Sequence, residues 1–254
     1  MNPSILVLGL LSLFGAAVHA EEAVNPLSVN IGAVSDYRYR GISQSRLQPA
    51  LQGGADYTFA SGLYVGTWLS TIRWIRDAGT INAVNAGNTR LEVDLYAGYK
   101  GDLVKDTLSY DVGVLAYVYP GNRYANVPGS ANANTTELYG ALTYGLFTAK
   151  YSTALTNTFG NGRSQYSGYL DLSATLDVGG GFSLVPHIGR QTIRSSAPSA
   201  NYTDYALTLS KDIVPGVTLS VAAIGTNADQ TVYYTPDNKF LGKTTLVVGA
   251  KYSF

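Results

Sequence analysis

Hydrophobic and polar residues alternate one by one along most of this chain. In residues 91–99, leucine, valine, alanine and tyrosine occupy every odd position, whereas Glu92 and Asp94 occupy even positions. A period of two is produced by an extended strand, whose side chains point alternately to its two faces. The stretch is therefore predicted to be a strand with one apolar face and one polar face.

The same pattern recurs often enough to predict twelve strands in all. Each has roughly nine to twelve residues, close to the length with which a tilted strand crosses a hydrocarbon layer. For the range 63–71 the pattern does not show which face points to the lumen, because neither face is strongly apolar or strongly polar. The predicted strands are 27–37, 50–59, 63–71, 89–100, 108–120, 136–144, 146–155, 168–177, 182–190, 202–210, 217–226 and 243–254.

The connections between these strands alternate between short and long. Short turns are predicted at 60–62, 101–107, 145, 179–181 and 211–216, and long loops at 38–49, 72–88, 121–135, 156–167, 191–201 and 227–242. This alternation is typical of an up-and-down barrel in an outer membrane, with both termini on the periplasmic side. We predict an all-β fold, a transmembrane antiparallel β-barrel of about 12 strands, as one domain over residues 21–254.

Physical chemistry supports closure and fixes the facing of the strands. In lipid an open sheet edge would leave backbone N–H and C=O groups without partners, so only a closed barrel is stable there. Slipping the strand at 89–100 by one residue would turn Arg90, Glu92 and Asp94 toward acyl chains, where a basic residue costs about 2–4 kcal/mol at mid-depth. The polar faces must therefore line the lumen.

Composition and the N-terminus fit an exported membrane protein. Charged residues make up 13% of the chain, whereas about 25% is usual. Residues 1–20 combine an apolar run with the small-residue pattern Val18-His19-Ala20 and are predicted to be a secretory signal peptide. No Lys or Arg precedes the apolar run, so an uncleaved anchor remains the alternative. The predicted location is the bacterial outer membrane.

The chain ends in an aromatic strand. Tyr252 and Phe254 lie on the apolar face of 243–254. We expect this strand to pair with the first one, and its terminal aromatic residues resemble the insertion signal that barrel-assembly machinery recognises. Expected partners are this machinery, outer-membrane lipids and lipopolysaccharide. Arg73, Arg76 and Asp77 surround Trp74 in the loop 72–88 and could meet lipopolysaccharide phosphates; a solvated interfacial loop is the alternative.

The polar faces provide candidate lumen residues, in which acids outnumber bases and weakly favour cations. Cross-strand pairing that only braces the barrel is the alternative for each of them. Arg38 and Arg40 beside Asp36, at the mouth, are the best candidates for contact with a solute. The candidates are Asp36, Arg38, Arg40, Asp56, Arg90, Glu92, Asp94, Asp111, Glu137, Lys150 and Asp171.

The predicted function is passive diffusion of small polar or ionic solutes through a narrow lumen. Twelve strands lie between barrels filled by side chains and open porins, and the loop 72–88 or 121–135 is expected to occlude the pore partly. One alternative is a membrane-embedded hydrolase, for which His187, predicted in mid-strand and inward, is the base that remains after signal removal. Another is a structural or adhesive barrel without conductance.

Other chemistry has no support in the sequence. The chain has no cysteine, no His cluster for a metal, no phosphate-binding glycine loop and no basic patch for nucleic acid. We therefore predict no cofactor, no metal and no catalytic residues. The oligomeric state is left open.

Several stretches resemble a known family. SDYRYRGISQS (35–45) and PALQGGADYTFASGLYVGTW (49–68) are the most specific of them, and LEVDLYAGYKG (91–101) and SGYLDLSATLD (167–177) extend the likeness over nearly the whole mature chain. Together they resemble the TorF family of proteobacterial outer-membrane porins. The resemblance implies an outer-membrane barrel that acts as a channel, and it brings no catalytic residues.

Overall fold

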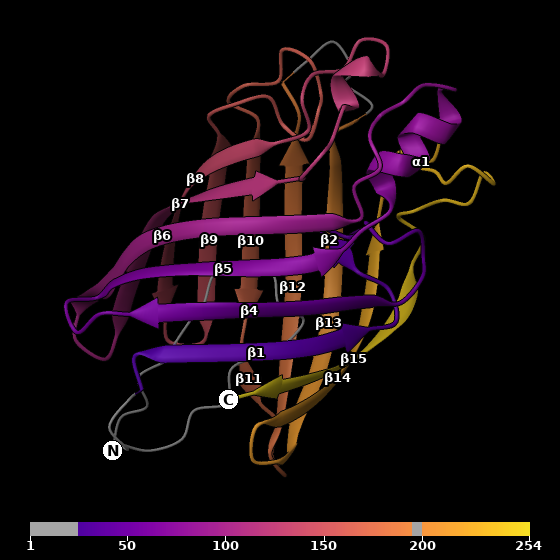
Figure 1. Ribbon diagram of the computed structural model, residues 1–254. Coiled ribbons are helices and arrows are strands. Elements are labelled where there is room, and N and C mark those ends of the chain that lie inside the picture. The colour runs from indigo at the N-terminus through magenta and orange to yellow at the C-terminus, as the bar shows by residue number, and fades with distance from the viewer. Residues whose placement is uncertain (1–24, 195–199) are drawn as a thin grey trace.

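The computed structural model describes residues 25–194 and 200–254, so the predicted signal peptide, residues 1–20, lies outside the described residues. Within them, twelve strand crossings form a closed antiparallel barrel (Figure 1). Neighbours in the sequence are neighbours in the sheet. The first strand pairs with the last, and β10 pairs with β12, which completes the ring. The predicted fold class is confirmed.

The strand boundaries lie close to those that the alternation predicts. β11 continues β10 along the same partner, β12, so the two count as one crossing. The wall consists of β1 (Leu27–Val34), β4 (Ala50–Thr58), β5 (Leu63–Thr71), β6 (Leu91–Val104), β7 (Leu108–Val118), β8 (Thr135–Tyr144), β9 (Phe147–Ala154), β10 (Gly168–Ala174), β11 (Leu176–Asp177), β12 (Phe182–Thr192), β13 (Tyr202–Val214), β14 (Val217–Thr226) and β15 (Thr245–Ser253).

Two strands run four residues further than predicted, and β12 runs two residues further. β6 continues to Val104 and β13 to Val214, so the turns expected at 101–107 and 211–216 are shorter. In β6 and β13 the register shifts near the end, between Asp102 and Val104 and between Asp212 and Val214. Such a bulge interrupts the alternation by one residue. The sequence pattern therefore breaks before the strand itself ends.

The outer surface of the barrel is apolar. Leu95 is 51% exposed and Leu207 is 48% exposed, which would be unfavourable in water but suits a hydrocarbon layer. The facing of β5, open from the sequence, is now clear because Tyr64 is 4% exposed and Leu63 is 43% exposed. Exposed aromatic residues gather near the short-turn end, as expected of an interfacial girdle: Tyr57, Phe59, Tyr144, Phe147, Tyr252 and Phe254.

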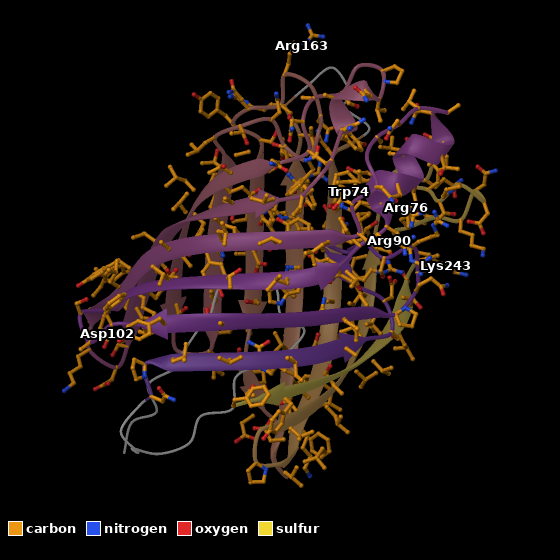
Figure 2. The ribbon with its side chains drawn as sticks, viewed as in Figure 1. Trp74, Arg76, Arg90, Asp102, Arg163 and Lys243 are labelled. Carbon is orange, nitrogen blue, oxygen red and sulfur yellow. The ribbon has the colours of Figure 1, made fainter. Side chains whose placement is uncertain are left out.

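The two ends of the barrel differ. The long loops, the helix α1 (Trp74–Ile81) and the 3-10 turn η1 (Tyr124–Asn126) lie at one end (Figure 1). Trp74 and Arg163 mark this end in Figure 2, and Asp102 marks the opposite, short-turn end. Among the described residues, no helix has the length and apolar character needed to cross a membrane.

Candidate functional site

The loop between β1 and β4 folds into the barrel as a hairpin. Its two short strands, β2 (Arg38–Tyr39) and β3 (Ile42–Ser43), pair with each other and are joined by Arg40 and Gly41. Both turn residues have positive φ, 47° and 78°, as a two-residue turn that matches the strand twist requires. We call residues 36–49 the lumen hairpin.

The lumen hairpin reaches several parts of the wall. The Tyr37 hydroxyl donates to Glu92 of β6 at 2.9 Å, and the Tyr39 hydroxyl lies 2.6 Å from that of Tyr117 in β7. A Cβ atom at Gly41 would collide with side chains of β13 and β14. Since the hairpin starts between β1 and β4 and touches the far wall, it crosses the lumen.

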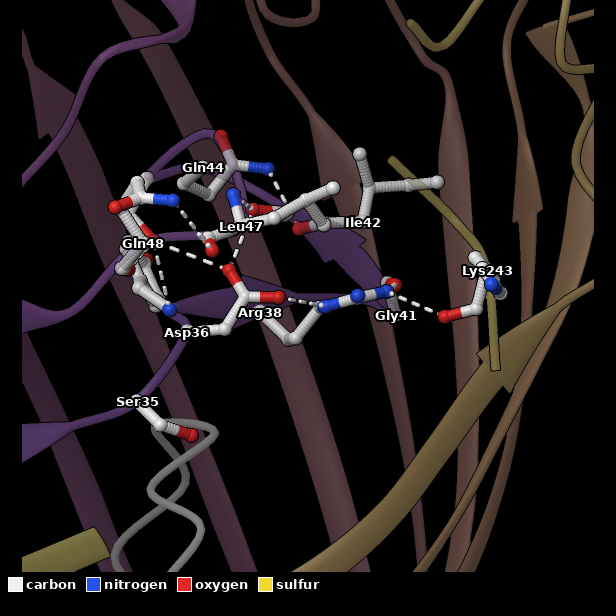
Figure 3. A network of polar contacts seen from close by, with 12 residues as sticks. Ser35, Asp36, Arg38, Gly41, Ile42, Gln44, Leu47, Gln48 and Lys243 are labelled. Carbon is white, nitrogen blue, oxygen red and sulfur yellow. Dashed lines mark hydrogen bonds and ion pairs between the residues drawn. The ribbon is translucent and has the colours of Figure 1, made fainter. Parts of the chain in front are cut away.

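Asp36 organises the base of the hairpin (Figure 3). Its carboxylate accepts hydrogen bonds from Arg38 Nε at 2.6 Å, from Ser43 Oγ at 2.5 Å and from Ser45 Oγ at 3.1 Å. Arg38 then donates to the backbone carbonyls of Gly41 at 3.0 Å and Lys243 at 3.2 Å. These contacts lock the hairpin to itself and to the segment before β15.

Arg40 anchors the tip of the hairpin. Its Nη2 donates to Glu137 of β8 at 2.7 Å and its Nη1 to Gln191 of β12 at 2.6 Å. The side chains of Arg40 and Glu137 are each 3% exposed, so this is a buried ion pair. The guanidinium also lies 4.2 Å from the ring centre of Tyr169, within the range of cation–π attraction. Loss of either charge would leave the other buried without compensation.

The wall itself carries tyrosine–carboxylate contacts. Tyr64 donates to Asp111 at 2.5 Å, and Tyr96 donates to Asp56. The Lys150 ammonium lies 4.0 Å from the ring centre of Tyr139. Inward glycines make room for these rings, since a Cβ at Gly98 would collide with the Tyr64 hydroxyl and one at Gly113 with that of Tyr139.

The chain matches a family model over residues 19–254, described as bacterial protein of unknown function (Gcw_chp). The chain belongs to the Gcw_chp family. No curated protein matches the sequence.

Two porins and an outer membrane channel are among the solved structures that have a similar fold. The KdgM porin is 9% identical, with a TM-score of 0.55, over 89% of this chain and 99% of its own. The NanC porin is 13% identical, with a TM-score of 0.53, over 90% and 98%. The COG4313 outer membrane channel from Pseudomonas putida F1 is 13% identical, with a TM-score of 0.50, over 90% and 94%. At these identities the likeness shows the fold.

His187 of this Gcw_chp barrel lies in β12 and within reach of three inward groups. Its Nε2 is 3.1 Å from Asp171 Oδ2 and 3.2 Å from the Tyr169 hydroxyl, and its Nδ1 is 3.6 Å from Asp204 Oδ2. The carboxylates come from β10 and β13, on either side of β12. The group therefore ties three adjacent strands together. Across residues 25–194 and 200–254, no cluster of side chains could hold a metal ion.

The structure gathers most of the predicted lumen residues inside the barrel, and it pairs Asp36 with Arg38 and Arg40 with Glu137. Lys150 and Asp171 are partly buried, whereas Arg90 is exposed at the long-loop end, because β6 begins only at Leu91 (Figure 2). The buried candidates are Asp36, Arg38, Arg40, Asp56, Glu92, Asp94, Asp111 and Glu137.

The occluding segment differs from the one expected. The loops 72–88 and 121–135 contribute Trp74 and Tyr124, whose rings pack at 5.1 Å at the long-loop end. The segment that crosses the lumen is the hairpin at 36–49, which was expected only at the mouth. Tyr37, Tyr39 and Gln191, which make contacts across the lumen, are not among the residues that the sequence pattern predicts for it. An Arg-Gly pair between Tyr39 and Ile42 is the signal that could have indicated a tight hairpin.

Proposed function

We propose that this Gcw_chp barrel is an outer-membrane porin-like channel, exported by the N-terminal signal peptide, through which small polar or ionic solutes diffuse passively. The observation that carries the proposal is a closed barrel with an apolar outside, a polar inside and a braced hairpin across the lumen. The shared fold of the KdgM and NanC porins and the resemblance to the TorF family support it.

The hairpin narrows the passage through the lumen. Its polar side chains are used in contacts with the wall and with each other, as with Arg38 and Arg40. A solute would therefore pass between the hairpin and the wall, next to groups such as Asp111 and Lys150. Such a passage favours small hydrophilic solutes over large ones.

The partners follow from the outer surface. We propose that the apolar belt contacts outer-membrane lipids and that the exposed Arg73 meets lipopolysaccharide phosphates at the long-loop end. Asp77 of the same loop is ion-paired with Arg46. We propose that Tyr252 of β15 and Phe254, which directly follows β15, serve barrel-assembly machinery, since both are exposed at the end of the strand that closes the ring.

Conductance in planar bilayers tests the channel. The wild-type barrel is compared with a variant in which a short Gly-Ser linker replaces residues 36–49, and circular dichroism and heat-modifiable migration check that both are folded barrels. We expect small single-channel steps for the wild type and larger ones for the variant. Absence of current from both folded proteins would refute the channel and favour a structural or adhesive barrel.

A further inference from the structure

A cavity of about 260 Å³ lies on the long-loop side of the lumen hairpin. Tyr39 and Ser43 of the hairpin line it, Trp74 of α1 lines it from another side, and Tyr234 comes from the loop between β14 and β15. Known small-molecule pockets run from about 300 Å³ upward and are mostly apolar, with a few polar groups. The size suits a molecule with one ring.

The lining of this cavity offers no unpaired charge to a ligand. Among the described residues that line the cavity, Asp77 is the one ionisable acid or base other than the tyrosines. Both of its oxygens accept hydrogen bonds from Arg46, and this contact raises the pKa of Arg46. Burial raises the pKa of Tyr124 and of Tyr233, so both phenols stay protonated. The described lining residues include no Lys, Arg or His, so an anionic ligand would find no cation among them.

One buried side-chain polar atom of the described lining lacks a hydrogen-bond partner. The indole nitrogen of Trp74 is buried and makes no hydrogen bond within the described part of the chain. The nearby amides are different, since Asn82 donates to Ala78 O and Asn161 to Thr158 O, each at 2.9 Å. A buried donor without an acceptor is unfavourable. An acceptor oxygen on a bound molecule would satisfy it.

We propose that this cavity binds an uncharged solute with a single ring and at least one acceptor oxygen, held between aromatic side chains on the outer side of the hairpin. Aromatic rings offer flat faces for the apolar face of such a ring, and the Trp74 N–H takes its oxygen. Neutral sugars and neutral aromatic alcohols share this chemistry. A role of this cavity in capturing solutes for transport rests on the proposed channel function. Binding of the solute does not depend on that function.

The cavity of this barrel is not suited to an acidic saccharide. The KdgM porin has been solved in complex with disordered oligogalacturonate, an acidic ligand. A carboxylate in the present cavity would lose its hydration and gain no cation in return. We therefore expect discrimination between each neutral molecule and its matched acid.

Calorimetric titration of the full barrel in lipid nanodiscs tests this. The probes are two matched pairs: D-glucose with D-glucuronate, and benzyl alcohol with benzoate. We expect at least one neutral probe to bind with saturation and its acid to bind at least about tenfold more weakly. The neutral probe that binds shows whether the ligand is a sugar or an aromatic alcohol. Equal binding of acid and neutral probe, or no saturation by either neutral probe below about 50 mM, would overturn the proposal.

Variants locate the site. Trp74→Phe keeps an aromatic side chain, although a smaller one, and removes the N–H; it should weaken binding at least about fivefold, the effect of one lost hydrogen bond. Tyr234→Ala should also weaken it, whereas Tyr166→Ala, at an exposed loop tyrosine outside the cavity, should not. Unchanged binding in both Trp74→Phe and Tyr234→Ala would overturn the site. Binding without conductance would refute the channel and leave the site intact.

Discussion

Arg40→Met tests whether the hairpin is held in the lumen by its buried ion pair. The substitution keeps an unbranched but shorter side chain and removes the charge that faces Glu137 at 2.7 Å. Removing one partner of a buried pair costs about 3–5 kcal/mol, because the other charge stays buried. Tyr117 also donates to the Glu137 carboxylate, at 3.2 Å, so we expect a value near the lower end.

A loss of about 3 kcal/mol lowers the ratio of inserted to displaced hairpin by roughly a hundredfold. Single-channel recording should then show larger or more frequent openings in Arg40→Met than in the wild type. The double variant Arg40→Met/Glu137→Gln should recover part of the difference, since it removes the uncompensated carboxylate. Arg90→Met, at an exposed arginine of the same end, is the matched control.

Wild-type values of both the conductance and the unfolding free energy in Arg40→Met would refute this role of the ion pair. That result would mean that the hairpin is held by its other contacts, such as Asp36 with Arg38. Equal openings in Arg40→Met and Arg90→Met would refute it as well.

Three further substitutions probe the turn, the lipid-facing surface and assembly. Gly41→Ala should enlarge conductance steps, because its φ of 78° costs another residue about 1–2 kcal/mol and its Cβ would collide with Thr226 and Asp204; unchanged steps would contradict this. Leu95→Arg should lower the unfolding free energy in vesicles by about 2–4 kcal/mol, with Leu95→Ile as the control that should lose far less. Phe254→Ala should slow insertion by purified assembly machinery, and equal insertion rates would disprove that role.

The wall could be predicted because the bilayer constrains every residue of a crossing strand. Glu92 and Asp94 are each 2% exposed and Leu95 is 51% exposed, as the alternation requires. A one-residue slip would reverse all of these positions. The alternation of polar and apolar residues therefore predicts both the strands and the face to which each side chain points. It fails where bulges near Asp102 and Asp212 shift the register.

The hairpin could not be predicted in the same way. A loop has no repeating constraint from lipid, and the partners of Arg40 lie 97 and 151 residues away along the chain. Nothing in the local sequence specifies these distances. The residue types at Asp36, Arg38 and Arg40 indicated a role at the mouth, but their pairing with each other and with the far wall depends on the closed barrel.

The pairing of the hairpin with the wall also affects the ion selectivity expected from the lumen charges. Residues 36–49 contain three arginines and one aspartate, but Arg46 pairs with Asp77 of α1, so Asp36, Arg38 and Arg40 bring a net charge of 2 − 1 = +1 into the lumen. Removal of the hairpin should shift the reversal potential in a salt gradient toward cations, because Glu137 would then face the open passage without Arg40. Glu137→Gln in the hairpin-free barrel should reverse part of the shift. A reversal potential that stays constant or moves toward anions would show that the hairpin does not set the field along the pore, and the excess of wall acids would then have to be balanced elsewhere.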